Sequence, residues 1–188
     1  MSLAHALGLL GYRSLHFPQD DRTREQVLAF LATGGDRLRL SVLERLDAVT
    51  DTPVCASFEA LDAAYPGSKF ILTIRDKETW LESCRAYWAS WVDSYLLARP
   101  DDPLPVYLIA IHAKIYGTPT FDREQFSRAY DDYHEAVRRH FVDRPEDLLT
   151  LNVCAGEGWA PLCKFLGLPR PRAKFPSENR MPPSGAWV

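Results

Sequence analysis

The spacing of apolar and polar residues divides the chain into short strands and longer amphipathic helices. Apolar runs bounded by turn residues predict strands at residues 12–17, 48–50, 69–74 and 148–153. Apolar residues at helical spacing predict helices at residues 3–11, 24–33, 36–47, 56–65, 77–98, 105–116, 122–141 and 157–167. Because strands and helices alternate, we expect an α/β fold with a mostly parallel sheet and right-handed crossovers.

Three of the predicted strands are followed at once by residues suited to chemistry. Asp51 follows the strand at 48–50, Arg75 follows the strand at 69–74, and the run Cys154–Gly158 follows the last strand. In parallel sheets, ligands bind beyond the carboxyl ends of the strands. The sequence therefore predicts a site along this rim.

Composition narrows the class of protein. The chain has 188 residues, of which 46% are hydrophobic and 25% charged, as is typical of a soluble globular protein. We expect a single domain over residues 1–188, in which residues 169–188 form an irregular proline-rich tail. A net charge of -3 without a basic run argues against nucleic acid as a partner. The four cysteines and five histidines lack metal-ligand spacing, so we expect no metal. Without a membrane-spanning run or a signal peptide, we expect no membrane partner and a cytoplasmic location.

The segment Lys69–Ser83 has the parts of an anion site. A strand ends at Arg75, and the following helix carries Ser83. An arginine fork and a helical hydroxyl suit phosphate oxygens. An equally good interpretation is a surface ion pair between Arg75 and Asp76 or Glu78.

The other two strand ends also have two interpretations each. Asp51 could accept a proton from an attacking hydroxyl, or cap the helix that follows from Val54, and spacing alone favours the cap. The small residues of Cys154–Trp159 would let the backbone approach a ligand, with Glu157 near a helix start. The glycine spacing fits neither a Rossmann nor a Walker signature, so an ordinary strand-to-helix turn is the simpler interpretation.

Several segments of the chain resemble those of a known protein family. The run KFILTIRDKETWLESC is similar to the 3′-phosphate-binding segment of sulfotransferases, in which an arginine closing a strand is followed eight residues later by serine, here Arg75 and Ser83. The run Thr50–Pro53 resembles the T-H-x-P segment that carries the catalytic base of cytosolic sulfotransferases, with Asp51 in the histidine position. The resemblance extends over roughly residues 1–180 and includes LGYRS, YPGSKFILT, YGTPTFD and GEGWAPLCKFLGLPRP.

The resemblance implies a P-loop NTPase-like sulfotransferase fold of three layers, α/β/α. It implies transfer of a sulfuryl group from 3′-phosphoadenosine 5′-phosphosulfate (PAPS) to a hydroxyl or amine of a small-molecule acceptor, without a metal. Arg75 and Ser83 would then hold the 3′-phosphate. Asp51 would be the base or would orient the acceptor, because aspartate is a weak base unless its pKa is raised. The resemblance also leaves a homo-oligomer open.

One part of the family pattern is absent from this sequence. Family members open with a strand and a glycine-rich loop for the 5′-phosphosulfate, and Met1–Leu3 matches only the end of that loop, with Ser2 as its terminal hydroxyl. Because the first strand of P-loop folds is central, its absence predicts two unpaired central strand edges. The explanations are an internal methionine of a longer enzyme, a strand supplied from elsewhere, or a degenerate relative.

These explanations keep two other functions in view. A degenerate relative would be a non-catalytic sulfotransferase-like binding protein. A P-loop kinase-like phosphotransferase is disfavoured because the sequence has no Walker A Gly-Lys-Ser/Thr motif. The acceptor itself is not specified by a motif, although the aromatic helix 77–98 and the segment 105–121 are expected to form its pocket.

Overall fold

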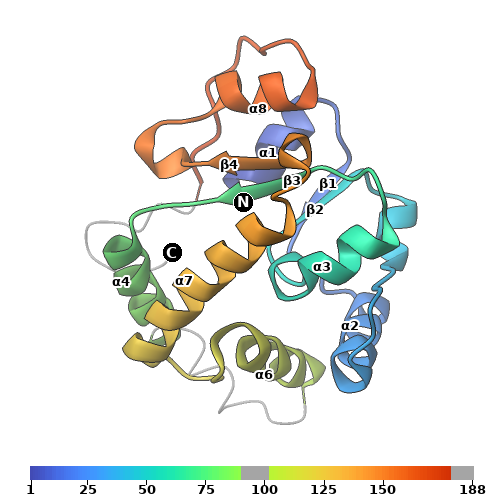
Figure 1. Cartoon of the computed structure of the whole chain (residues 1–188), viewed down its shortest axis with the longest axis vertical. Coiled ribbons are helices and arrows are strands. Elements are labelled where there is room, and N and C mark those ends of the chain that lie inside the picture. Colours follow the sequence, from blue (N-terminus) through green and yellow to red (C-terminus); the bar gives the residue numbers. More distant parts are fainter. Residues whose placement is uncertain (90–101, 179–188) are drawn as a thin grey trace. The chain divides into compact units, whose positions relative to one another are not determined.

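The computed structural model describes residues 1–89 and 102–178, which form two compact units. The first unit contains residues 1–75 and 136–178, and the second contains residues 76–89 and 102–135. Both units are coloured by sequence in Figure 1. The prediction that residues 1–188 fold as a single domain stays a prediction.

The predicted alternation of strands and helices is confirmed (Figure 1). The strands are β1 (Ser14–His16), β2 (Ala48–Thr50), β3 (Phe70–Thr73) and β4 (Leu148–Leu151). The α-helices are α1 (Ser2–Leu9), α2 (Asp21–Thr33), α3 (Val54–Ala64), α4 (Lys77–Tyr87), α6 (Pro103–Tyr116), α7 (Arg123–His140) and α8 (Trp159–Leu166). Short 3-10 helices are η1 (Ser41–Glu44), η3 (Pro145–Asp147) and η4 (Val153–Ala155).

The helix predicted at residues 36–47 is wrong. Gly34 ends α2 in the left-handed conformation, and within the predicted range 36–47 the structure has one short helical turn, η1. Leu38 and Leu40, which precede η1, are both buried, at the two-residue spacing of an extended segment. The Leu38 amide donates to the carbonyl of Ala60, so this backbone bonds to α3 and not to itself. The helix predicted at 77–98 is confirmed as far as α4, and its part beyond residue 89 lies outside the described residues.

The strands form two separate parallel pairs, both in the first unit. In the first pair, β1 lies beside β2, and His16 is in register with Thr50. In the second pair, β3 lies beside β4, and Thr73 is in register with Leu151. Within the described residues, each of the four strands is hydrogen-bonded to one neighbouring strand alone. That the unpaired edges are central ones, left by an absent first strand, stays a prediction.

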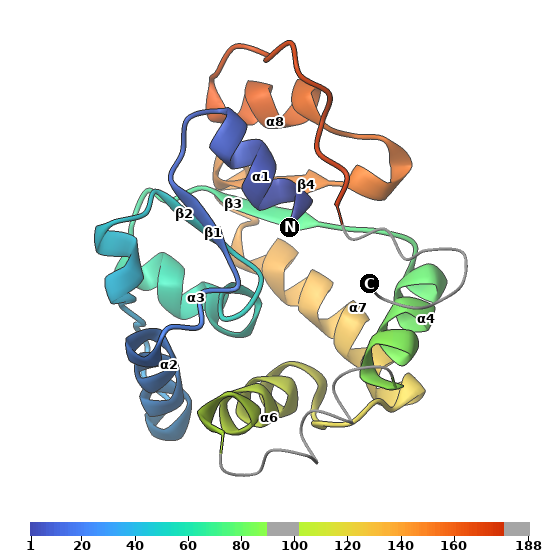
Figure 2. The ribbon, with the colours of Figure 1, turned by 180° about the vertical axis from the view of Figure 1, so that it is seen from behind.

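Helices cover both faces of these strands in the first unit, as Figures 1 and 2 show for α1 and α8 on one side and α3 on the other. Ile71 and Leu149 pack against a buried cluster from α1 and α8 that includes Ala6 and Leu162. The neighbouring residue Phe70 points to the opposite face, because side chains alternate along a strand. Its ring lies 5.0 Å from that of Phe141. This arrangement is the mixed α/β architecture that the sequence predicted.

A buried carboxylate joins α3 to the end of α7 in the same unit. The Asp62 side chain is 8% exposed and accepts hydrogen bonds from both terminal nitrogens of Arg144, at 3.2 and 2.6 Å. His140 Nε2 lies 2.8 Å from Asp62 Oδ2. The hydrogen bonds from Arg144, and then that from His140, hold the pKa of Asp62 below its usual value although burial opposes the shift. This ionic contact joins α3 to the carboxyl end of α7 and the turn that follows it.

Aromatic packing organises the second unit. Its core contains Leu81, Trp88 and Phe126, and Tyr116 stacks on Phe126 with ring centroids 4.1 Å apart. The indole nitrogen of Trp88 donates to the carbonyl of Pro119 at 3.0 Å. These rings therefore form a packed core, whereas the prediction that residues 77–98 and 105–121 form an acceptor pocket stays a prediction. None of the helices in the described parts of the chain is both long and apolar enough to cross a membrane.

Candidate functional site

Asp51 stands at the carboxyl end of β2 in a left-handed backbone conformation, with φ at 72°. Its Oδ1 accepts a hydrogen bond from the amide of Thr52 at 2.8 Å, and the Val54 amide bonds to the Asp51 backbone carbonyl. The residue that precedes α3 is Pro53, which makes no side-chain cap. The capping interpretation of the Asp51 carboxylate is therefore wrong. Its second oxygen, Oδ2, makes a separate contact with a neighbouring strand.

That second oxygen faces His16, a residue that the sequence analysis missed. His16 Nε2 lies 3.3 Å from Asp51 Oδ2, and His16 Nδ1 lies 3.1 Å from Thr50 Oγ1. The parallel register of β1 and β2 brings the three residues together at adjacent strand ends. A polar residue at the end of the strand predicted at 12–17 was the available signal. Without the strand order, that signal did not connect His16 to Asp51.

The imidazole of His16 is half-buried, with 30% of its side chain exposed. Its pKa is lowered from the ordinary histidine value, chiefly because burial removes the ring from water. The charge of Asp51 opposes this shift and the amino group of Met1 adds to it. Because an ordinary histidine titrates near pH 6.5, we expect a neutral His16 at pH 7.

Ser2 lies at the beginning of α1, close to this pair. Its hydroxyl accepts a hydrogen bond from the amide of Glu178 at 2.9 Å, so the chain at Glu178 lies against the beginning of the first helix. The carboxylate of Glu178 also contacts His5. The nitrogen of Met1, next to Ser2, is 3.3 Å from His16 Nδ1. The structure thus brings Ser2 and Asp51 into one neighbourhood around His16.

Arg75 and Ser83 belong to different units. Arg75 follows β3 in the first unit, where the preceding amide of Ile74 extends the pairing with a bond to Leu151. Ser83 lies in the interior of α4 in the second unit. The joint binding of one phosphate by Arg75 and Ser83 stays a prediction.

The two carboxylates considered as ion-pair partners of Arg75 both make contacts in the second unit. The Asp76 side chain caps α4 by accepting from the amide of Thr79 at 2.8 Å. The Glu78 carboxylate pairs with Arg123 at 2.5 Å. Each carboxylate thus has a structural role of its own in stabilising this unit.

The loop after β4 is a strand-to-helix turn closed by its own side chains. Asn152 Oδ1 accepts from the amide of Ala155 at 3.0 Å, and Glu157 Oε2 accepts from the amide of Asn152 at 2.6 Å. The turn interpretation of this segment is therefore confirmed. The Glu157 carboxylate is engaged in holding the loop.

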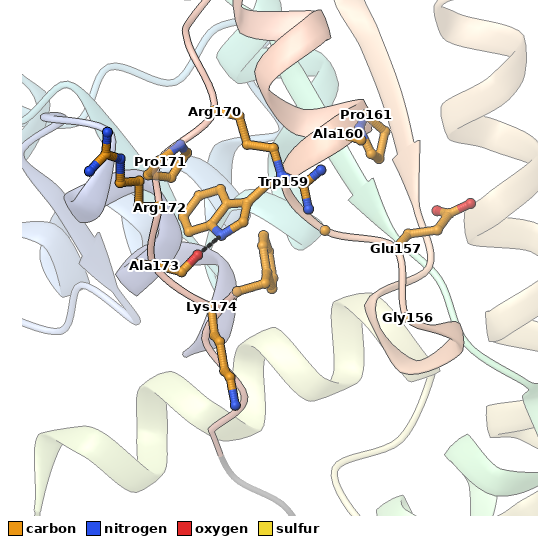
Figure 3. A pocket seen from close by; sticks show the side chains of 12 residues that line it. Gly156, Glu157, Trp159, Ala160, Pro161, Arg170, Pro171, Arg172, Ala173 and Lys174 are labelled. Carbon is orange, nitrogen blue, oxygen red and sulfur yellow. Dashed lines mark hydrogen bonds between the residues drawn. The ribbon is translucent and has the colours of Figure 1, made fainter.

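A pocket of about 590 Å³ lies between this loop and the tail (Figure 3). Trp159 is one of the residues that line it, and its indole nitrogen donates to the carbonyl of Ala173 at 2.7 Å. Its lining residues are Gly156, Glu157, Gly158, Trp159, Ala160, Pro161, Arg170, Pro171, Arg172, Ala173, Lys174 and Phe175. The pocket contains none of the predicted site residues Ser2, Asp51, Arg75 and Ser83.

Metal-ligating side chains do not gather into a site in the described part of the chain. No group of three or more histidine, cysteine, aspartate or glutamate residues with suitable geometry occurs there. The polar groups found at the strand ends are instead a carboxylate, an imidazole, hydroxyls and a guanidinium, which can accept protons and bind anions.

Comparison with known proteins shows to which family the chain belongs. A sequence model of the family described as "Sulfotransferase domain" matches residues 1–182. The Aspergillus versicolor protein named Ava biosynthesis cluster protein M is 33% identical over 151 residues. That match covers 72% of this chain and 55% of the Aspergillus protein, so the chain spans about half the length of that relative. The chain belongs to the sulfotransferase-domain family.

Proposed function

We propose that this protein is a sulfotransferase that moves a sulfuryl group from PAPS to a hydroxyl or amine of a small-molecule acceptor. The observation that carries the proposal is the family match over residues 1–182, which includes Ser2, Asp51, Arg75 and Ser83 in the order of the sulfotransferase motifs. The name of the Aspergillus relative refers to a biosynthesis cluster, which supports a small molecule as the acceptor.

The residue types fit the chemistry. Sulfuryl transfer resembles phosphoryl transfer, in which the protein positions two reactants in line and stabilises developing charge. An arginine fork at Arg75 and a hydroxyl at Ser83 are suited to the nucleotide 3′-phosphate. A carboxylate at Asp51 is suited to orienting the acceptor or accepting its proton. PAPS, when bound, supplies the activated sulfuryl group.

Nucleotide binding is the first test. Isothermal titration of the full chain with 3′-phosphoadenosine 5′-phosphate (PAP) should give saturable binding. Replacing Arg75 with alanine should raise the Kd by about 10- to 100-fold, because a bidentate, charge-assisted contact is lost. Ser83→Ala should raise the Kd by about five-fold, as for a neutral hydrogen bond. Arg22→Ala, on the exposed face of α2, is the matched control and should leave the Kd unchanged.

The outcomes of this titration separate the alternatives. Wild-type protein that remains folded but does not bind PAP at millimolar concentration would rule out the nucleotide site. Equal effects of the Arg75 and Arg22 substitutions would show general electrostatics in place of a specific contact.

Turnover is the second test, measured with sulfur-35-labelled PAPS and phenolic acceptors. Transfer should be unaffected by EDTA, whereas a kinase-like phosphotransferase would require Mg²⁺ between its phosphates. Saturable PAP binding without transfer to any acceptor would favour the non-catalytic alternative. Full turnover by Asp51→Asn would remove Asp51 from proton transfer.

A further inference from the structure

The pair formed by His16 and Asp51 suggests that the two side chains have different roles in proton transfer at the strand ends. His16 ends β1 and Asp51 follows the last residue of β2, and the register of His16 with Thr50 places both at the same carboxyl edge. Their nearest atoms, His16 Nε2 and Asp51 Oδ2, are 3.3 Å apart. This distance exceeds the 2.7–2.9 Å or so of a charge-assisted hydrogen bond. A shared proton would draw the two atoms closer.

The backbone fixes the direction of the carboxylate. The left-handed conformation of Asp51 turns the chain sharply after β2, and the Thr52 amide holds Oδ1 at 2.8 Å. A left-handed backbone is uncommon for residues other than glycine, although aspartate tolerates it better than most. Oδ2 is thereby left facing the imidazole.

The contacts of His16 are compatible with a tautomer that carries its hydrogen on Nδ1. Nδ1 is 3.1 Å from Thr50 Oγ1, a hydroxyl oxygen that can accept a hydrogen bond from Nδ1–H or donate one to an unprotonated Nδ1. The nitrogen of Met1 is 3.3 Å from Nδ1 and 3.5 Å from Nε2. A donor in line with one ring nitrogen would lie much farther from the other, so these near-equal distances place Met1 off both lone-pair directions. With the hydrogen on Nδ1, the lone pair of Nε2 faces the same space as Asp51 Oδ2.

We propose that His16 is the proton acceptor of the transfer reaction and that Asp51 stabilises the imidazolium that forms. This inference rests on the proposed function. As the acceptor oxygen bonds to sulfur, the bond from sulfur to the phosphate oxygen of PAPS breaks and PAP leaves with that oxygen. The acceptor O–H bond breaks and its proton passes to His16 Nε2. The imidazolium then closes the gap to Asp51 Oδ2 and later releases the proton to water.

Proton affinity favours imidazole over carboxylate for this role. An imidazole is inherently a stronger base than a carboxylate, and in its neutral form it has a nitrogen lone pair free to accept a proton. The charged groups facing His16 are Asp51, Glu178 and the amino group of Met1, while His5 on α1 is engaged with Glu178. Burial keeps the ring neutral at pH 7, as its role requires.

The geometry of the pair can be tested without turnover. In a nitrogen-15 NMR titration of the five histidine rings, the signal missing from His16→Gln identifies His16. Asp51→Asn should then lower the pKa of His16 further, because the negative partner of the imidazolium is lost. Asp47→Asn is the matched control: it removes a carboxylate that binds Arg13. An unchanged His16 pKa in Asp51→Asn would overturn the pairing.

Catalysis is tested with two acceptors of different acidity. His16→Gln should lower kcat for 2-naphthol, which is neutral at pH 8, by about 10²- to 10⁴-fold. The loss should be much smaller for p-nitrophenol, which is already largely ionised and needs no base. The Kd for PAP should stay at the wild-type value. Equal losses with both phenols, or no loss with either, would overturn the role of His16.

The same experiment separates this inference from the proposed function. If wild-type protein binds PAP and transfers sulfate, but His16→Gln retains full turnover, the proposed function stands and the inference fails. If wild-type protein neither binds PAP nor transfers sulfate, the proposed function fails, and the inference fails with it. In that case the NMR titration still decides whether His16 and Asp51 form a pair.

Discussion

Replacing Asp62 with asparagine should destabilise the first unit more than any other removal of one charge from α3. The carboxylate is nearly buried and accepts three hydrogen bonds, two from Arg144 and one from His140. Asparagine keeps the shape of the side chain but replaces one oxygen with an amide donor. That donor would face the N–H groups of Arg144 or His140.

The size of the effect follows from burial. Removing one member of a fully buried ion pair costs about 3–5 kcal/mol, and a hydrogen bond to a charged group is worth about 1.5–3 kcal/mol. Because the Arg144 side chain is 38% exposed, water can replace part of what it loses. We therefore expect Asp62→Asn to lower the free energy of unfolding by about 2–3 kcal/mol at pH 7.

Urea unfolding measures this change, with Glu59→Gln as the control. Glu59 is exposed on the same helix, so its substitution should change stability by less than about 0.5 kcal/mol. The pKa of Asp62 is lower in the folded protein than in the unfolded chain. Its stabilisation is therefore complete above the unfolded pKa and lost as pH falls through the folded pKa. Equal stabilities of the two variants at pH 7, or a difference that persists at very low pH, would refute this reasoning.

Two further predictions concern burial. Burial lowers the pKa of His112 to about 4, so protonation of this residue in the unfolded chain should reduce the free energy of unfolding by about 2 kcal/mol between pH 7 and pH 5. His112→Phe should flatten this dependence of stability on pH, and parallel pH profiles of the two proteins would contradict the prediction. A methyl group added at Gly158 would lie 2.9 Å from Phe175, so Gly158→Ala should cost about 1–3 kcal/mol in thermal unfolding. Gly8→Ala, with 3.8 Å of clearance, should be neutral or stabilising, and similar losses in both would contradict the steric argument.

Local pattern predicted most elements because their signals are local. The run from Phe70 to Thr73 is apolar and bounded by turn residues, and it forms β3. The helix predicted at 36–47 failed because apolar residues in a short segment fit two periods. Leu38 and Leu40 are buried from a non-helical backbone, and a bond from the Leu38 amide to the carbonyl of Ala60, distant in sequence, decides that conformation.

The candidate site shows the same difference between features that local sequence predicts and features that long-range contacts decide. The sequence by itself determined the fold class, the family resemblance and the position of Asp51 after a strand, because strand ends and motif spacing are written along the chain. Only the tertiary structure decided that Asp51 is not a helix cap and that His16, 35 residues earlier in the chain, is its neighbour. The pairing of β1 with β2 sets that contact, and strand order depends on long-range hydrogen bonds and packing that no local pattern encodes.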